Sequence, residues 1–222
     1  MTRAILFDFN GVIIDDEPQH CQALTETLGE YGITLDRERY YREYLGFDDR
    51  ECFRFTFERH GRATDAATLA DAIERKARHY GSAIRHSMTL VPGAVDFVRA
   101  SAADGLFLAV VSGALRREIE LVLEVARLRE HFRVVIAAED VSASKPDPQG
   151  YLRARRALAV DAADCVVVED SLPGLAAARA AGLRCAALAT SHSADALADA
   201  DLVWPDLAGR KPSDLPWADA AA

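Results

Sequence analysis

The chain has 222 residues, of which 50% are hydrophobic and 27% are charged, and its formal net charge is −9. This composition is typical of a globular protein with room for a main domain and a smaller one. Proteins that bind nucleic acids generally carry a basic stripe, and no long basic run occurs here, so we expect no nucleic-acid partner.

The cysteines and the apolar runs indicate in which cellular compartment the protein is expected. Four cysteines lie far apart and form no C-x-x-C pair, which argues against a zinc or redox motif and fits a reduced, intracellular protein. Residues 1–7 do not read as a signal peptide, and no apolar run approaches the roughly 18 residues of a membrane span. We therefore expect a cytoplasmic protein with no membrane partner, either a monomer or a small homo-oligomer.

Short apolar segments alternate with segments of helical periodicity along most of the chain. The expected strands are residues 4–7, 106–111, 134–137, 165–168, 184–188 and 201–204. The expected helices between the later strands are residues 95–103, 115–126, 148–158 and 174–181. Strands that are apolar nearly throughout are covered on both faces. The pattern predicts an α/β fold, a Rossmann-like parallel sheet flanked by helices.

The segment after the first strand has a different character. It is rich in Glu, Arg, Tyr and Phe with helical spacing, most clearly at residues 17–31 and 69–84, and it contains no convincing strand. We predict an all-helical domain at residues 17–88, inserted into an α/β core domain made of residues 1–16 and 89–222.

Carboxylates follow two of the expected strands. Asp8 comes directly after the first strand, and Glu169 with Asp170 follows the strand at 165–168. An aspartate at a strand end can act as a nucleophile and as a metal ligand, and a pair of acids suits Mg²⁺. Because ligands bind outside the carboxyl ends of parallel strands, we expect these groups at one edge of the sheet.

Groups that can hold an anion follow two other strands. Ser112, Gly113 and Ala114 offer a hydroxyl and backbone N–H groups, and Lys145 offers an ammonium that can neutralise a phosphate. Each piece alone has an ordinary explanation as a turn, a surface loop or a helix cap. Nucleophile, anion donors, cation and metal site together predict phosphoryl transfer.

These segments, in this order, resemble the motifs of the haloacid dehalogenase superfamily. The matching segments are Asp8-Phe9-Asn10-Gly11-Val12-Ile13-Ile14-Asp15, Ser112-Gly113, Lys145-Pro146-Asp147-Pro148 and Glu169-Asp170-Ser171-Leu172-Pro173-Gly174. The resemblance covers essentially the whole chain. It is greatest to the subgroup of beta-phosphoglucomutase and phosphoglycolate phosphatase, whose members carry a small helical cap at this point.

The resemblance implies a role for each core residue that matches. Asp8 would attack phosphorus and form an aspartyl-phosphate. Mg²⁺ would bind the Asp8 carboxylate, the backbone carbonyl of Asn10, and Asp170, with Glu169 beside it or joined to it through water.

The same resemblance places the phosphoryl group. Ser112 and the N–H of Gly113 or Ala114 would hold the transferring group, and Lys145 would neutralise its charge.

The resemblance also implies substrate contacts in the cap. The loop Gly46-Phe47-Asp48-Asp49-Arg50 resembles the cap loop that closes over the active site in this family. Arg50 and Lys76 are the candidate anion contacts, and His20 lies near the hinge, where some relatives place a histidine that positions substrate or carries protons. Taken alone, each of these residues is equally an ordinary surface residue.

Asn10 departs from the family pattern, which has a second aspartate at this place. That aspartate protonates the leaving oxygen and activates water, whereas a carboxamide has no titratable proton. General acid–base catalysis contributes about 10²–10⁴-fold, so one step should slow by about that factor. Three explanations stay open: a natural variant with His20, Asp15 or Asp16 as a stand-in, an engineered trap, or a binding protein.

Other branches of the superfamily also lack this aspartate. Dehalogenases attack carbon without Mg²⁺, and the pair Glu169-Asp170 would have little purpose there. Phosphonatases use an early lysine of the cap, whereas the first lysine of this chain is Lys76.

We therefore predict a Mg²⁺-dependent phosphatase, a hydrolase that acts on a small phosphorylated metabolite. A sugar phosphomutase resembling beta-phosphoglucomutase is the alternative among enzymes. A protein that binds a phosphorylated metabolite without turnover is the alternative outside them. Sugar phosphates, phosphoglycolate and nucleoside monophosphates all remain open as ligands.

Overall fold

The computed structural model describes residues 2–44 and 47–218, so Gly46 of the expected cap loop lies outside the described residues. The chain divides into two compact units. One comprises Met1–Asp15 with Thr89–Ala222, and the other comprises Asp16–Met88. We call them the core and the cap. Within the described ranges, no helix is long and apolar enough to cross a membrane.

The core is built on a six-stranded sheet in the order β3-β2-β1-β4-β5-β6, and every neighbouring pair is parallel. The strands are β1 (Ala4–Phe7), β2 (Phe107–Val111), β3 (Phe132–Ile136), β4 (Cys165–Glu169), β5 (Arg184–Leu188) and β6 (Leu202–Trp204). This arrangement confirms the predicted α/β, Rossmann-like class.

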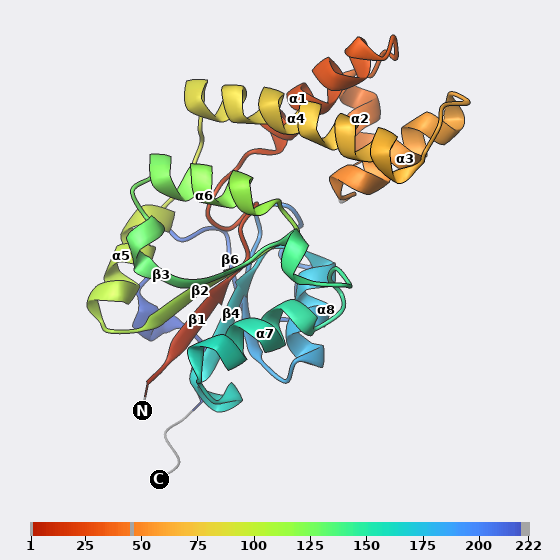
Figure 1. The fold of residues 1–222 in the computed structure, drawn as a ribbon. Coiled ribbons are helices and arrows are strands. Elements are labelled where there is room, and N and C mark those ends of the chain that lie inside the picture. The colour runs from red at the N-terminus through yellow and green to blue at the C-terminus, as the bar shows by residue number, and fades with distance from the viewer. Residues whose placement is uncertain (1, 45–46, 219–222) are drawn as a thin grey trace. The chain divides into compact units, whose positions relative to one another are not determined.

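Helices cover both faces of the sheet. Figure 1 shows α5 (Ala94–Ala103) and α6 (Arg116–Val125) on one face, with α7 (Gln149–Leu158) and α8 (Leu172–Ala180) on the other. Short 3-10 helices occupy Arg129–His131, Ala138–Asp140, Ala162–Asp164 and Pro212–Asp214. Coverage on both faces explains why β1 and β4 are apolar and buried along nearly their whole length.

The third strand begins earlier than its apolar pattern predicts. Arg133 is exposed and interrupts the apolar run, so the pattern alone starts the strand at Val134. Phe132 nevertheless belongs to β3, because its ring is buried and packs edge-on against Phe7 with the ring centroids 5.8 Å apart. Packing against β1, two strands away in the sheet, therefore overrides the local pattern at this end.

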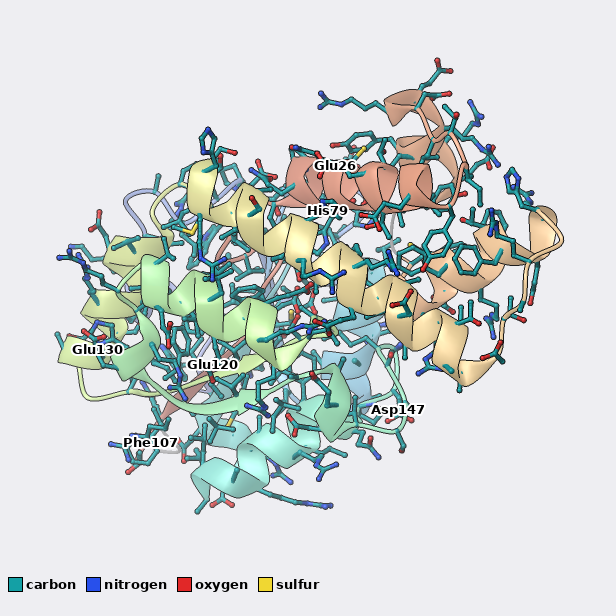
Figure 2. The ribbon with its side chains drawn as sticks, turned by 45° about the horizontal axis from the view of Figure 1, so that its top comes forward. Glu26, His79, Phe107, Glu120, Glu130 and Asp147 are labelled. Carbon is teal, nitrogen blue, oxygen red and sulfur yellow. The ribbon has the colours of Figure 1, made fainter. Side chains whose placement is uncertain are left out.

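The cap is all-helical, with a hydrophobic core of its own. Its helices are α1 (Glu17–Glu30), α2 (Arg37–Glu43), α3 (Asp49–Arg59) and α4 (Ala66–His86). The side chains of Leu28, Phe53 and Phe57 are fully buried in that core. Figure 2 labels Glu26 on α1 and His79 on α4, whose carboxylate oxygen and Nδ1 lie 2.9 Å apart.

Aspartates begin three of the cap helices. Asp36, Asp48 and Asp65 each accept a backbone N–H of the first turn that follows, as N-cap residues do. The N-cap position of α1 is held by Asp16, whose side chain makes no capping hydrogen bond. Asp15 therefore lies one residue before the N-cap of this helix.

Two glycines with a left-handed backbone test how closely the core is packed. Gly93 has φ +80°, and a Cβ there would lie 2.3 Å from the carbonyl of Leu207, whereas a Cβ at Gly182 (φ +70°) would meet nothing within 4 Å. Both alanine variants should lose about 1 kcal/mol through backbone strain. Gly93→Ala should lose about 1–3 kcal/mol more because it also overpacks. Denaturant unfolding measures the difference, and equal losses would contradict it.

Candidate active site

The site is assembled where β1 and β4 end side by side. The two strands pair in register, with Phe7 opposite Val168, and the backbone N–H of Asp8 donates to the carbonyl of Val168 at 2.8 Å. Asp8 therefore leaves the sheet next to Glu169, the last residue of β4. The pairing of two short strands thus brings together carboxylates that are far apart in the sequence.

Lys145 joins the two carboxylates. Its Nζ lies 2.5 Å from Oδ1 of Asp8 and 2.6 Å from Oε1 of Glu169. Burial opposes the charged ammonium, but the two carboxylates outweigh it and raise the pKa of Lys145 above its usual value. The lysine is therefore a permanent cation at this edge, and 18% of its side chain remains exposed to solvent.

Glu169 is fully buried, and both of its oxygens are occupied. Oε1 accepts Lys145 and, at 2.8 Å, the hydroxyl of Tyr151. Oε2 accepts the backbone N–H of Asp170 at 2.9 Å, and both the N–H and the hydroxyl of Ser171 at 3.0 Å. Burial favours the neutral acid, but Lys145 and these donors together hold the pKa of Glu169 below its usual value.

The first turn of α8 is shaped around that carboxylate. A Cβ at Gly174 would lie 1.8 Å from Oε1 of Glu169, so the position accepts only glycine without rearrangement. Ser171 is the N-cap of the helix and accepts the N–H of Gly174 at 3.1 Å. A serine thus caps α8, and Asp170 does not, although a capping role for Asp170 was the ordinary alternative.

Asp170 completes a group of three acids. One carboxylate oxygen each from Asp8, Glu169 and Asp170 lie within 4.8 Å of one another. Burial, opposed in part by Lys145, raises the pKa of Asp8 to about 7. Burial and the neighbouring carboxylates raise the pKa of Asp170 to about 8. Without a further cation, ionising these neighbouring carboxyl groups costs free energy, since buried like charges repel.

The loop after β5 holds two parts of this site. The hydroxyl of Ser191 donates to Oδ2 of Asp170, and the hydroxyl of Thr190 donates to the carbonyl of Gly11 at 2.7 Å. Gly11 has φ +74°, and a Cβ there would lie 1.9 Å from Oδ2 of Asp170. The loop after β1 can therefore approach the acid only because residue 11 is glycine.

Asn10 lies in the same loop and is half-buried. The loop folds back on itself, since the N–H of Gly11 donates to the carbonyl of Ile14 at 2.7 Å and Asn10 forms a bridge with Ile14. A carboxamide thus lies in the loop that follows β1, two residues after Asp8.

The predicted anion-binding turn follows β2, the other neighbour of β1. Ser112 is 6% exposed, and its N–H donates to the carbonyl of Ile136 at 2.9 Å. Its Oγ accepts the N–H of Ala114 at 3.0 Å, while Gly113 is exposed with nothing near the Cβ position. The serine hydroxyl is thereby oriented by the turn, which leaves its own proton to donate.

Within the cap, the predicted residues His20 and Lys76 contact each other. Lys76 is 2% exposed, and its Nζ lies 2.6 Å from Nδ1 of His20 and 2.7 Å from Oδ1 of Asp49. Nε2 of His20 lies 3.2 Å from Asp16. Each ring nitrogen of the histidine therefore has a charged neighbour. Arg50, in the first turn of α3, is exposed.

Sequence reasoning missed three residues of this site: Ser191 and Tyr151, which contact acids, and Thr190, which bonds the carbonyl of Gly11. Thr190 and Ser191 follow β5, so their place after a strand was a usable signal, because the carboxyl ends of parallel strands share one edge. Tyr151 carries no such signal. It lies on the apolar face of α7, where an aromatic residue is ordinarily part of the core.

Comparison with known proteins places the chain in a family. Residues 5–188 match the model of the haloacid dehalogenase-like hydrolases. Protein CbbY of Rhodobacter capsulatus is 29% identical over 221 residues, which are 96% of this chain and 97% of that protein. Hexitol phosphatase B of Escherichia coli (strain K12) is 29% identical over 181 residues, 82% of this chain and 81% of the phosphatase.

A solved structure agrees with the sequence matches. It is CbbY from Rhodobacter sphaeroides, a mutant with asparagine in place of an aspartate, in complex with xylulose-(1,5)bisphosphate. It superposes with a TM-score of 0.87 at 29% identity, covering 97% of this chain and 99% of that one. The chain is therefore an enzyme of the haloacid dehalogenase-like hydrolase family, as its four motifs predicted.

Proposed function

We propose that this chain is a Mg²⁺-dependent phosphatase of a small phosphorylated sugar, acting through an aspartyl-phosphate at Asp8. The observation that carries the proposal is the position of the Lys145 ammonium, which lies between Asp8 and Glu169 at the carboxyl edge of the sheet. Relatives named for hexitol phosphate hydrolysis, or bound to xylulose-(1,5)bisphosphate, support a sugar phosphate as the substrate class.

The chemistry follows from the groups at that edge. A carboxylate oxygen of Asp8 attacks phosphorus, the bond from phosphorus to the ester oxygen breaks, and the alkoxide that leaves takes its proton from solvent water, since Asn10 has none to give. The hydroxyl of Ser112 and the N–H of Gly113 hold the phosphoryl oxygens, and Lys145 offsets their charge. Water then attacks the aspartyl-phosphate, which releases inorganic phosphate and restores Asp8.

The donor set of the site fits Mg²⁺. Its ligands are hard carboxylate oxygens, and the raised pKa values of Asp8 and Asp170 mark a deficit of positive charge. Asp8, Asp170 and the backbone carbonyl of Asn10 would hold the ion. Glu169 would contribute through water, because its oxygens already accept five donors. When bound, the ion supplies charge neutralisation for the phosphoryl oxygens.

A sugar phosphomutase is the second candidate. The contact between the partly exposed His20 and the buried Lys76 favours it, because a mutase needs a second anion contact for the phosphate that does not react. Hydrolysis is the first choice, since a mutase must also keep water from the aspartyl-phosphate. A protein that only binds its ligand would have no use for Asp8 beside a lysine. We keep the cytoplasm as the expected location.

The nucleophile is tested by Asp8→Asn. The amide is not nucleophilic, so phosphoenzyme should vanish and turnover of sugar phosphates should fall at least about 10³-fold. Rapid mixing with substrate, acid quenching and mass measurement of the intact chain detect the phosphoenzyme. Asp104→Asn, an exposed residue just before β2, is the control and should behave as the unaltered chain does. Turnover that survives in Asp8→Asn removes Asp8 from the mechanism.

The loss of rate that we attribute to Asn10 is tested by Asn10→Asp. A carboxyl group can protonate the leaving oxygen, so the first-turnover rate with an alkyl phosphate should rise about 10-fold or more. The rise with an aryl phosphate should be smaller, because phenolate leaves without help. Asn10→Ala, which adds no titratable group, should show no gain. An equal gain for both esters would contradict a role in proton transfer.

The energetic cost of placing three acids together is tested by comparing Asp170→Asn with the unaltered chain in the presence of a metal chelator. The folded-state pKa of Asp170 lies above its usual value, so ionisation of this group destabilises the metal-free fold as pH rises from about 4 to about 8. The variant should therefore gain on the order of 2 kcal/mol of unfolding free energy at pH 8, and little at pH 5. Urea unfolding at both pH values measures this, and a gain independent of pH would be inconsistent with it.

A further inference from the structure

We propose that Tyr151 is a positioning residue for Lys145, which it controls through the carboxylate that the two share. The inference rests on the proposed function for its effect on turnover, but not for its structural part. Tyr151 lies in the first turn of α7 and is 1% exposed. Its hydroxyl is the one polar atom that this side chain brings to the interior.

Two contacts link Tyr151 to the lysine. Its hydroxyl donates to Oε1 of Glu169 at 2.8 Å, the same oxygen that accepts Lys145 at 2.6 Å. Nζ of Lys145 also lies 5.1 Å from the centroid of the tyrosine ring, within the range of a cation–π contact. The ammonium is thus flanked by the ring, by Glu169 and by Asp8.

The hydroxyl limits how strongly Glu169 attracts the lysine. Burial raises the pKa of Tyr151, so the group remains a donor throughout the working range. Each hydrogen bond that Oε1 accepts offsets part of its negative charge. Without the hydroxyl, Oε1 would be compensated by Lys145 alone, and the ammonium would move toward Glu169 and away from Asp8.

Other contacts prevent Glu169 from adjusting in place of the lysine. Its Oε2 is held by two backbone N–H groups and the hydroxyl of Ser171, and the first turn of α8 fills the space at Gly174. The carboxylate is therefore a fixed point, and the mobile member of the network is the long side chain of Lys145. Loss of one donor should appear as displacement of the ammonium.

The test uses Tyr151→Phe, which keeps the ring and removes only the hydroxyl. Tyr44→Phe is the matched control, since Tyr44 is also 1% exposed and its hydroxyl bonds Thr56 at 2.9 Å within the cap. The first readout is the ¹⁵N resonance of the Lys145 ammonium in the metal-free protein. It should shift in Tyr151→Phe and stay unchanged in Tyr44→Phe.

The second readout is a double-mutant cycle on turnover of a sugar phosphate. Tyr151→Phe should lower kcat about 10-fold in the unaltered chain, and less than about 2-fold when Lys145→Gln is already present. KM should change less than kcat, because the ring and the fold are retained. A purely structural role would lower the rate by the same factor in both backgrounds.

The outcomes separate the two proposals. An unmoved Lys145 resonance, or equal losses in both backgrounds, overturns the positioning role of Tyr151. If the unaltered chain and Asn10→Asp both fail to hydrolyse any phosphate ester, the phosphatase proposal fails, and the resonance still decides the role of Tyr151.

Discussion

The site depends on one interaction, the contact of a single ammonium with two buried carboxylates. Three acids converge at the end of β1 and β4, where burial alone would keep all of them neutral. Lys145 reverses this for Glu169, which also accepts donors from Tyr151, Asp170 and Ser171. Glu169 is therefore an ionised and saturated anchor, whereas the pKa values of Asp8, which also contacts Lys145, and of Asp170 stay raised.

This difference between Glu169 and the other two acids leaves Asp8 and Asp170 available for chemistry. A carboxylate that is fully satisfied by its neighbours is a poor nucleophile and a poor metal ligand. Asp8 and Asp170 instead have pKa values near neutrality, so a cation or a developing positive centre such as phosphorus would relieve a cost that the fold already bears. The left-handed turn at Gly11 and the hydroxyl of Ser191 hold Asp170 at this edge despite that cost.

In the proposed mechanism, Asn10 would change the balance between the steps rather than the assembly of the site. The backbone of its loop is held by Ile14 and Thr190, neither of which involves the carboxamide. Attack by Asp8 needs no acid if the leaving group is good, whereas release of phosphate needs an activated water. In the cap, His20 has Lys76 at one ring nitrogen and Asp16 at the other. A proton carried by this histidine would therefore have to pass through its present partners.

The sequence by itself determined the fold class, the family and four of the residues that meet at the sheet edge. The reason is that strands buried on both faces are recognisable as apolar runs, and the carboxyl ends of parallel strands meet at one edge. Asp8 and Lys145 are 137 positions apart and still touch, as this rule requires. The bounds of β5 were predicted to the residue, whereas no bounds were predicted for α2 and α3, because the apolar spacing of the cap is irregular there.

Only the tertiary structure decided which acid is the anchor and which are left reactive. Glu169 and Asp170 are adjacent and chemically alike in the sequence. They differ because one faces Lys145 and Tyr151 and the other faces Ser191. Hydrogen-bond partners that lie 18 or 21 positions away leave no trace in periodicity or composition. The pKa of a buried carboxyl depends on such partners, so it is a property of the folded chain.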